Sequence, residues 1–348
     1  MQILDFWEQG IWNSKLLEFA IQMMLMLVLG HTLALSRPIE NLISKVLNYC
    51  SNTSTSAAII TFSTILVSFF NWGLGLVFGA IFARKVGEYA CKNSIKLNYP
   101  LIGAAGYSGM MVWHGGISGS APIKIAEEGH FLSEKIGVIS QGSTIFSTMN
   151  ITISILLIVI LPLCMYFIGK KSKGHIINIS AKKIENSEKT QKYGIEKLDH
   201  SKMLASIFGS IIICFIIYKT FILPENISLS IITPNYINFL LLGLCILMHQ
   251  TFSNFLKSIQ QSIGGTSGIL IQFPLYFGIM GIMTESGLVE IMSNFFVSIS
   301  NEKTFPILTF ASAGIINIFV PSGGGQWAIQ GPIIVEAIEA SSFKINIE

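Results

Sequence analysis

A break inside an apolar segment is the feature that most constrains this chain. Residues 101–112 are apolar enough to continue as a membrane helix, but they lead directly into 113–122, which holds three glycines, two serines, a histidine and a proline. Such residues favour turns and leave backbone groups without helical partners. Inside a bilayer this backbone is tolerated only where it is buried in protein or lines a cavity. The segment predicts either a helix broken at mid-depth, as in transporter binding sites, or a loop at the membrane surface.

The composition favours a membrane protein. Of the 348 residues, 51% are hydrophobic and 12% are charged, and the mean hydropathy is +0.63. Soluble domains usually carry about twice that charged fraction. The net charge of +3 is too small to indicate a nucleic-acid partner. Five scattered cysteines without metal-ligand spacing indicate neither a disulfide framework nor a metal site.

Three kinds of apolar segment occur along the chain. Long, nearly uncharged runs predict complete membrane helices at 16–35, 145–168, 203–223 and 237–256. Runs interrupted by Gly, Pro, Ser or Asn predict broken helices or re-entrant hairpins at 57–83, 99–126, 262–283 and 304–337. The short run 287–299 is expected at the membrane interface. We therefore expect an all-α, polytopic helical bundle with broken helices.

A basic segment divides the chain into two parts. Residues 170–202 contain nine of the 22 Lys and Arg but only four acidic residues. The positive-inside rule places such a segment in the cytoplasm. It predicts a first membrane repeat at 1–169, a cytoplasmic linker at 170–202 and a second membrane repeat at 203–348.

The two parts resemble each other weakly. Each has an Asn and an aromatic residue near a Gly-rich interruption, with Asn71 in the first part and Asn317 in the second. Paired interruptions of this kind favour inverted repeats with a site where the breaks meet. Because the offset between the two breaks is about 250 residues, the counterpart of 113–122 is expected beyond residue 348, which would leave the second repeat incomplete.

The site prediction depends on what the apolar segments lack. No Asp, Glu, Lys or Arg lies deep in a clear span. An anion would be held by helix N-termini, backbone N–H groups and hydroxyls, and carbonyls freed at the same breaks could coordinate a cation. The predicted substrate-binding residues are His114, Gly115, Gly116, Ser118, Gly119, Ser120, Ser322, Gly323, Gly324, Gly325 and Gln326. The predicted coupling-ion ligands are Asn71, Gly73, Asn317 and Ser322.

Several of these residues also have purely structural interpretations. His114 is either a proton-coupling group or a hydrogen-bonding histidine that fixes the break. His31 and His249 lie in apolar spans, where helix contacts are the simpler explanation. The run Gly323–Gly325 could be a tight turn without a ligand. The segment 264–268 belongs either to the substrate path or to a close helix contact.

The same stretches carry a family resemblance. Residues 70–75, 99–101, 107–109, 112–122, 129–131 and 319–332 resemble the signature blocks of the bacterial short-chain fatty acid transporters, within the ion transporter superfamily. The resemblance implies an inner-membrane secondary carrier of butyrate- or acetoacetate-like monocarboxylates, with inverted repeats, an elevator-like motion and a homodimer. Members normally have a further segment at the start and further spans at the end, so a non-functional fragment is an alternative.

Other classes fit the sequence less well. An enzyme would need a nucleophile, base or metal set, and no paired carboxylates or His-x-x-x-His occur. A channel usually has rings of pore-lining charge or a filter. A dicarboxylate carrier of the same superfamily is the closest competitor. We therefore expect a non-enzymatic carrier that binds a small carboxylate in the bilayer, without a cofactor or metal. The coupling ion, H⁺ or Na⁺, is left open.

Overall fold

The computed structural model describes residues 1–176, 194–224 and 228–341, and over these ranges it contains helices and no strand. Five helical stretches in them are long and apolar enough to cross a membrane. They are Ser14–Ala34, Thr53–Phe70, Thr148–Lys171, Lys202–Ile222 and Phe252–Glu285. The prediction of an all-α, multi-pass membrane protein is therefore confirmed.

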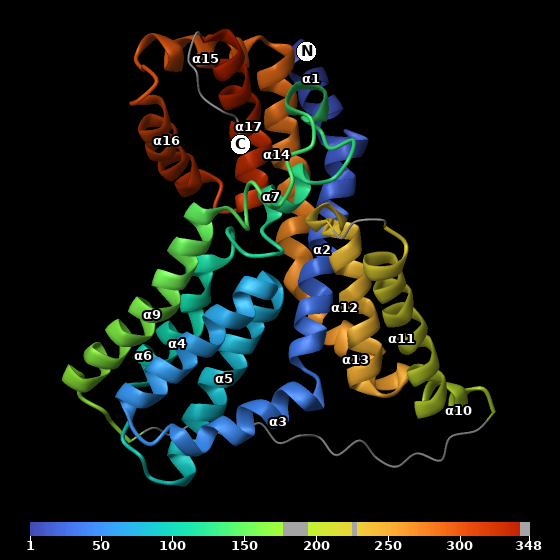
Figure 1. Ribbon diagram of the computed structural model, residues 1–348, viewed down its shortest axis with the longest axis vertical. Helices are drawn as coiled ribbons and strands as arrows, with labels where there is room; N and C mark the ends of the chain where they lie inside the picture. The colour runs from blue at the N-terminus through green and yellow to red at the C-terminus, as the bar shows by residue number, and fades with distance from the viewer. Residues whose placement is uncertain (177–193, 225–227, 342–348) are drawn as a thin grey trace.

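The chain passes through short, long and broken helices in turn (Figure 1). Their bounds are α1 (Gln2–Ile11), α2 (Ser14–Ala34), α3 (Arg37–Val46), η1 (Leu47–Tyr49), α4 (Thr53–Phe70), α5 (Trp72–Lys92), α6 (Tyr99–Tyr107), η2 (Ser108–Val112), α7 (Ser120–Ile125), α8 (Ser133–Ile136), α9 (Thr148–Lys171), α10 (Glu196–Asp199), α11 (Lys202–Ile217), η3 (Tyr218–Ile222), η4 (Leu229–Ile231), α12 (Pro234–His249), α13 (Phe252–Ser262), η5 (Ile263–Thr266), α14 (Ser267–Glu285), α15 (Leu288–Ser298), α16 (Phe305–Phe319) and α17 (Gly323–Ala340).

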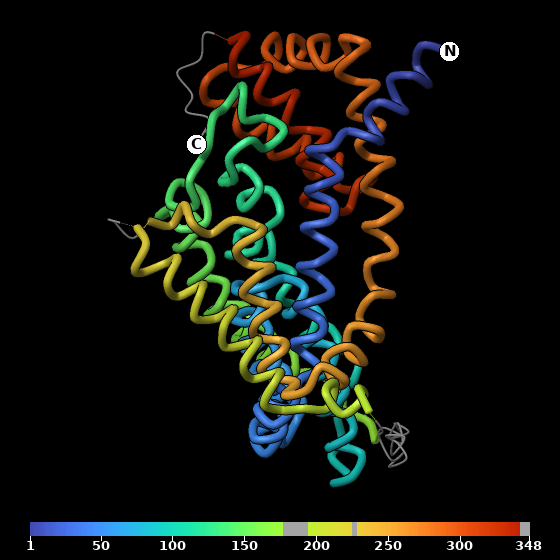
Figure 2. The backbone as a smooth tube through the Cα atoms, turned by 90° about the vertical axis from the view of Figure 1, so that its right-hand side faces the viewer, coloured from blue at the N-terminus to red at the C-terminus, as the bar shows by residue number. Residues whose placement is uncertain are grey.

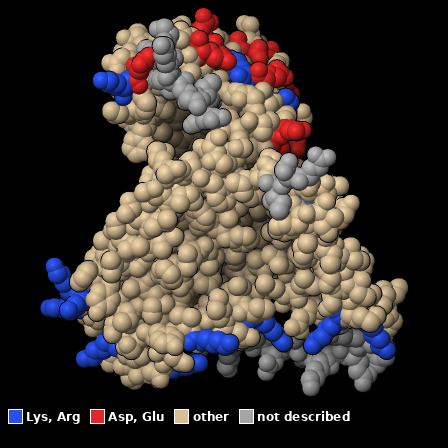
Figure 3. All heavy atoms as spheres, viewed as in Figure 1, with Lys and Arg blue, Asp and Glu red and all other residues tan. Residues whose placement is uncertain are grey.

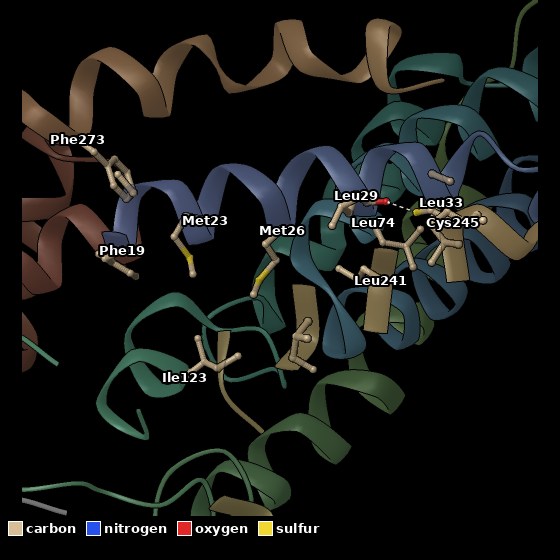
Figure 4. Close-up of a cluster of buried hydrophobic side chains, with 14 of the residues drawn as sticks. Phe19, Met23, Met26, Leu29, Leu33, Leu74, Ile123, Leu241, Cys245 and Phe273 are labelled. Atoms are coloured by element: carbon tan, nitrogen blue, oxygen red, sulfur yellow. Dashed lines mark hydrogen bonds between the residues drawn. The ribbon is translucent and has the colours of Figure 1, made fainter. Parts of the chain in front are cut away.

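Helix α2 is the central element. It begins where Asn13 accepts a hydrogen bond from the Leu16 N–H at 3.2 Å, which satisfies one of the free N–H groups of the first turn. It then descends beside α5, α12 and the α13–α14 stretch (Figures 1 and 2). Its side chains Phe19, Met23 and Met26 are buried in the main apolar core (Figure 4). The hairpin formed by α4 and α5 packs against this helix through α5, and α17 approaches it at Phe19.

The first hairpin is formed by α4 and α5 and rises from the lower end to the middle of the molecule (Figure 1). Its tip is Asn71, whose Oδ1 accepts from the Leu74 N–H at 2.7 Å and so caps α5. Helix α6 packs on this hairpin so closely that a Cβ on Gly106 would lie 2.6 Å from the Gly79 carbonyl oxygen. The predicted interruption of 57–83 is therefore a hairpin tip.

The second hairpin, α16 and α17, has the opposite direction. It descends from the upper end, and its tip at 320–322 reaches the middle of the molecule (Figure 1). Ser322 caps α17 by accepting from the Gly325 N–H at 3.3 Å. Helix α15 lies across the upper end, and a place at the membrane interface stays a prediction for 287–299. The opposed hairpins agree with the inverted arrangement that the sequence favours.

One predicted membrane helix ends earlier than the sequence predicts. The sequence predicts a single helix over 237–256, but α12 stops at His249 because Gln250 adopts a left-handed conformation with φ of 62°. Thr251 then accepts from the Asn254 N–H at 3.2 Å and starts α13. The polar residues His249, Gln250 and Thr251 interrupt the apolar run at this turn, a local signal that the predicted span 237–256 passed over.

Charge is unevenly distributed between the two ends. The upper end is acidic and the lower end is basic (Figure 3). The basic side chains are carried by α3, by the lower ends of α5 and α9 and by the start of α11. This asymmetry agrees with a cytoplasmic lower end. Most of the linker predicted at 170–202 lies outside the described residues, so the three-part division of the chain stays a prediction.

Candidate functional site

The first hairpin tip is bonded to the break at 113–119. The Ile117 N–H donates to the Phe69 carbonyl at 2.7 Å, and the Trp72 N–H donates to Ser118 Oγ at 2.9 Å. Ser118 is fully buried, so its hydroxyl serves as a cap for the start of α5. These two bonds hold the tip and the broken helix together in the middle of the molecule.

The second hairpin tip reaches the same break from the other direction. A Cβ on Gly323 would collide with the His114 ring and lie 3.2 Å from Ser120 Oγ. A Cβ on Gly324 would lie 2.6 Å from the Phe19 ring. Glycine is needed at both positions because no other residue allows the helix start to come so near its neighbours. The two hairpin tips and the broken helix therefore converge, as the sequence predicts.

A cavity of about 370 Å³ lies at this junction. Its size is within the range of small-molecule binding pockets. It is lined by Met23, Leu27, Trp72, Tyr107, Met110, Trp113, His114, Ser120, Gly265, Gly268, Ile269, Gln272, Phe273, Asn317, Pro321, Ser322 and Gly323. None of these lining residues is Asp, Glu, Lys or Arg. A charged ligand in this cavity would be held by dipoles and hydrogen bonds alone.

The start of α17 is the part of the cavity best suited to an anion. The N–H groups of Gly323 and Gly324 have no acceptor among the described residues, as expected for the first residues of a helix. The positive end of the helix dipole adds to their attraction for negative charge. The Ser120 and Ser322 side chains line the cavity beside them. At α5, by contrast, Asn71 and Ser118 already satisfy N–H groups of the first turn.

The cavity contains only part of the predicted site. His114, Ser120, Asn317, Ser322 and Gly323 line it. The other predicted residues lie behind its surface, and they are Asn71, Gly73, Gly115, Gly116, Ser118, Gly119, Gly324, Gly325 and Gln326. Ligand contact and ion coordination stay predictions for all of them.

The glycines behind the surface have a packing explanation. A Cβ on Gly116 would lie 2.6 Å from the Phe69 carbonyl oxygen, and one on Gly325 would lie 2.6 Å from the Tyr276 ring. A Cβ on Gly73 would lie 3.0 Å from the Cα of Leu27 in α2. These residues therefore let the backbone segments approach one another and so shape the cavity from outside.

Gln326 belongs to a polar network that joins the two arms of the second hairpin. Its Nε2 donates to the Ala313 carbonyl at 2.9 Å, and its Oε1 accepts from Asn317 Nδ2 at 2.9 Å. One turn later, Gln330 Nε2 donates to Ser312 Oγ at 2.9 Å. In an apolar surrounding such bonds hold helices together. The network orients Asn317, which does line the cavity.

The structure separates the interpretations of the histidines. His249 Nε2 is 2.8 Å from the Thr32 carbonyl, which ties α12 to α2 and agrees with a helix contact. The His114 ring makes no hydrogen bond to any described residue, although it lines the cavity. It therefore does not fix the break by hydrogen bonding.

The segment 264–268 also lines the cavity, through Gly265 and Gly268. A Cβ on Gly265 would meet nothing within 4 Å, and one on Gly268 would meet only Gln272 Oε1 at 3.9 Å. Close helix packing therefore does not explain these glycines, and the interpretation as part of the substrate path is favoured.

Sequence reasoning missed the apolar walls of the cavity. Met23 and Leu27 come from α2, and Ile269 and Phe273 come from α14. Both helices are apolar all along their length, so nothing local in the sequence marks the side that faces a cavity. Tyr107 lies just before the break and Trp113 is its first residue, and both belong to the stretches that carry the family resemblance.

Comparison with known proteins identifies the family. A family model described as short chain fatty acid transporter matches residues 1–346. The chain belongs to the short-chain fatty acid transporter family. Relatives from Escherichia coli and Haemophilus influenzae are 35% and 34% identical, over 98% of this chain and 76% of each relative. Both are named "Putative short-chain fatty acid transporter". No solved structure matches.

Membership in this family agrees with the expectation of a transporter rather than an enzyme. The apolar helices and the family together describe a multi-pass membrane transporter whose helix breaks enclose a cavity at mid-height.

Proposed function

We propose that this protein is an ion-coupled secondary carrier that moves butyrate- or acetoacetate-like monocarboxylates across the inner membrane. The family and the names of the two relatives support the class of cargo. The basic lower end supports an orientation with that end in the cytoplasm. The observation that carries the proposal is the cavity at the hairpin tips, which combines an open helix N-terminus with apolar walls.

The carboxylate binds at the start of α17 in this proposal. The N–H group of Gly323 and the hydroxyls of Ser120 and Ser322 line the cavity there and are the available donors. Helix N-termini bind anions in this way without a cationic side chain. The hydrocarbon part then lies against the apolar walls formed by residues such as Met23 and Phe273.

The walls favour a monocarboxylate over a dicarboxylate. A second carboxylate would have to leave water and face Trp72, Trp113 and Phe273. Burying a charge without a partner is costly, and no lining residue carries a permanent positive charge. Succinate is therefore the informative competitor.

The coupling ion balances the charge of the substrate. A proton would be carried by His114, whose ring lines the cavity, while Na⁺ would be bound by Asn317, Ser322 and freed carbonyls at the second tip. Asn71 and Gly73 lie behind the cavity surface, so they would act on the ion site through the position of the first tip.

The test is uptake of labelled butyrate into proteoliposomes, with H⁺ and Na⁺ gradients imposed separately. Protein-free vesicles measure the leak, because protonated butyric acid crosses lipid unaided. We expect saturable uptake above the leak, driven by one of the two gradients and resistant to excess succinate. Ser120→Ala should reduce it, whereas Ser172→Ala should not, since the Ser172 hydroxyl bonds only its own helix at Gly169. Uptake equal to the leak, or blocked by succinate as strongly as by butyrate, would contradict the proposal.

A further inference from the structure

Along α2, about two helical turns separate the start of α17 from the first hairpin tip. Tyr276 of α14 lies beside Gly325 at the second tip, and Gly268 precedes it by eight residues. On α2, Phe19 lies beside Gly324, and eight residues later Leu27 lies beside Gly73 at the first tip. At 1.5 Å per residue, both helices place the far end of the cavity about 12 Å from the start of α17.

An aromatic wall, formed by Trp72, Trp113 and Tyr107, lies at the far end. The ring centroids of Trp72 and Trp113 are 6.1 Å apart, and those of Tyr107 and Trp113 are 5.9 Å apart. Trp113 Nε1 donates to Ser68 Oγ at 3.3 Å, and the Trp72 backbone is bonded to Ser118. Rings that pack in tilted or edge-to-face pairs and are also held by hydrogen bonds cannot easily move aside for a longer ligand.

Gly265 of η5 and Gly268 of α14 also line the far end of the cavity. A Cβ on Gly265 would meet nothing within 4 Å, and one on Gly268 would meet only Gln272 Oε1 at 3.9 Å. Neither glycine has a positive φ. A glycine in such a position destabilises a helix by about 0.5–1 kcal/mol relative to alanine. Neither packing nor backbone conformation therefore requires these glycines, and what they provide is free volume in the cavity.

We propose that Gly265 and Gly268, together with the aromatic wall, determine the chain length of the transported acid. The inference rests on the proposed function, in which the carboxylate binds at the start of α17. The start of α17 and the far end of the cavity are about 12 Å apart. The acid must stay at van der Waals distance, about 3.5–4 Å, from the atoms at each end, which leaves roughly 4–5 Å for its own heavy atoms. An extended chain of about four carbons, with bonds of about 1.5 Å, fits this length. A side chain on either glycine shortens the space for the tail without touching the carboxylate end.

The test adds side chains to the two glycines and compares acids of increasing length. Labelled acetate uptake into proteoliposomes is inhibited with unlabelled acetate, butyrate or hexanoate, for wild type, Gly265→Leu, Gly268→Leu and Gly264→Leu. Gly264 is the matched control, since it lies in the same turn and is equally free of neighbours but does not line the cavity.

We expect Gly265→Leu and Gly268→Leu to weaken inhibition by butyrate about tenfold or more, and by hexanoate further, with acetate unchanged. Gly264→Leu should show the same inhibition by acetate, butyrate and hexanoate as the wild type. Equal effects on all three acids, or no change in their order, would overturn the inference. If Gly268→Leu does not elute as a folded protein in size-exclusion chromatography, Gly268→Ala takes its place. Gly268→Ala should weaken inhibition by a smaller factor, and the effect should appear first for hexanoate. Wild-type protein that transports none of the acids above the leak would instead refute the proposed function.

Discussion

Trp72 and Ser118 lie 46 residues apart in the chain, yet the Trp72 N–H donates to Ser118 Oγ at 2.9 Å. This bond joins the first hairpin tip to the broken helix at the level of the cavity. Across the described residues, no hydrogen bond joins the second tip, 320–323, to the same break. The first tip is therefore held by hydrogen bonds, whereas the second tip touches the break only through close packing at Gly323 and Gly324.

Ser118→Ala should lower the free energy of unfolding by about 1–2 kcal/mol, because it leaves the part-buried Trp72 N–H at the start of α5 without an acceptor. The measurement is the midpoint of thermal unfolding in detergent. Ser172→Ala is the control, since that hydroxyl donates only to the Gly169 carbonyl of its own helix. Equal midpoints for the two variants would show that the bond between tip and break does not contribute to stability.

Gly323→Ala should abolish saturable uptake, because the new methyl group would collide with the His114 ring and displace the start of α17. Gly314→Ala in the preceding helix is the matched control, since a Cβ there meets nothing within 4 Å. The control should keep its uptake and gain about 0.4–1 kcal/mol of stability. Gly323→Ala protein with wild-type uptake would place the substrate elsewhere.

The ion pair between Lys124 and Glu127 should be strongly coupled. Lys124 Nζ lies 2.6 Å from Glu127 Oε2, its side chain is only 3% exposed, and Gln22 bonds both groups. Glu127→Leu should lower the free energy of unfolding by about 3 kcal/mol, since it leaves the buried Lys124 ammonium without its carboxylate. The double variant Lys124→Met with Glu127→Leu should recover most of this loss. A double-mutant cycle in a detergent unfolding assay measures the coupling, and additive costs would contradict it.

His130, which lies between α7 and α8, should make the stability of the fold depend on pH. Its Nδ1 accepts from the Leu132 N–H at 3.2 Å and its Nε2 donates to the Gly137 carbonyl at 2.8 Å, so the folded state holds the neutral ring. Burial lowers the pKa of His130 below its usual value near 6.5, and the bond to Gly137 opposes the shift only in part. The contribution to stability is complete above pH 6.5 and is lost as the pH falls from there toward the lowered pKa of the folded state.

Unfolding midpoints measured between pH 8 and pH 5 test this expectation for His130. His130→Gln, which cannot be protonated in this range, should flatten the part of the profile below pH 6.5. A wild-type profile with the same slope as that of the variant would show that His130 does not contribute.

The basic end should face the cytoplasm. In a background in which all five cysteines are replaced, Glu8→Cys in α1 should react with an impermeant maleimide added outside intact cells. Lys173→Cys, just beyond the end of α9, should react only after the cells are permeabilised. The reverse pattern would invert the assigned orientation.

The sequence by itself determined the membrane class, most helices and three of the four predicted helix interruptions. The fourth, predicted at 262–283, lies in one helical stretch from Phe252 to Glu285 that contains only the short turn η5. Hydropathy and the local preferences of Gly, Ser, Asn and Pro act within a few residues, so the break at 113–119 and the tip at Ser322 are visible without a structure. The end of α12 at His249 was missed, although the polar residues His249, Gln250 and Thr251 mark a turn there.

Only the tertiary structure decided which side chains form the cavity. Ser118 and Ser120 are two residues apart and chemically identical, yet one caps a helix and the other lines the cavity. Met23 and Phe273 are indistinguishable in sequence from other apolar residues of their helices. The difference arises from how α2, α14 and the two hairpins are rotated against one another. That rotation depends on contacts between residues far apart in the chain, such as Gly323 with His114 and Gly73 with Leu27.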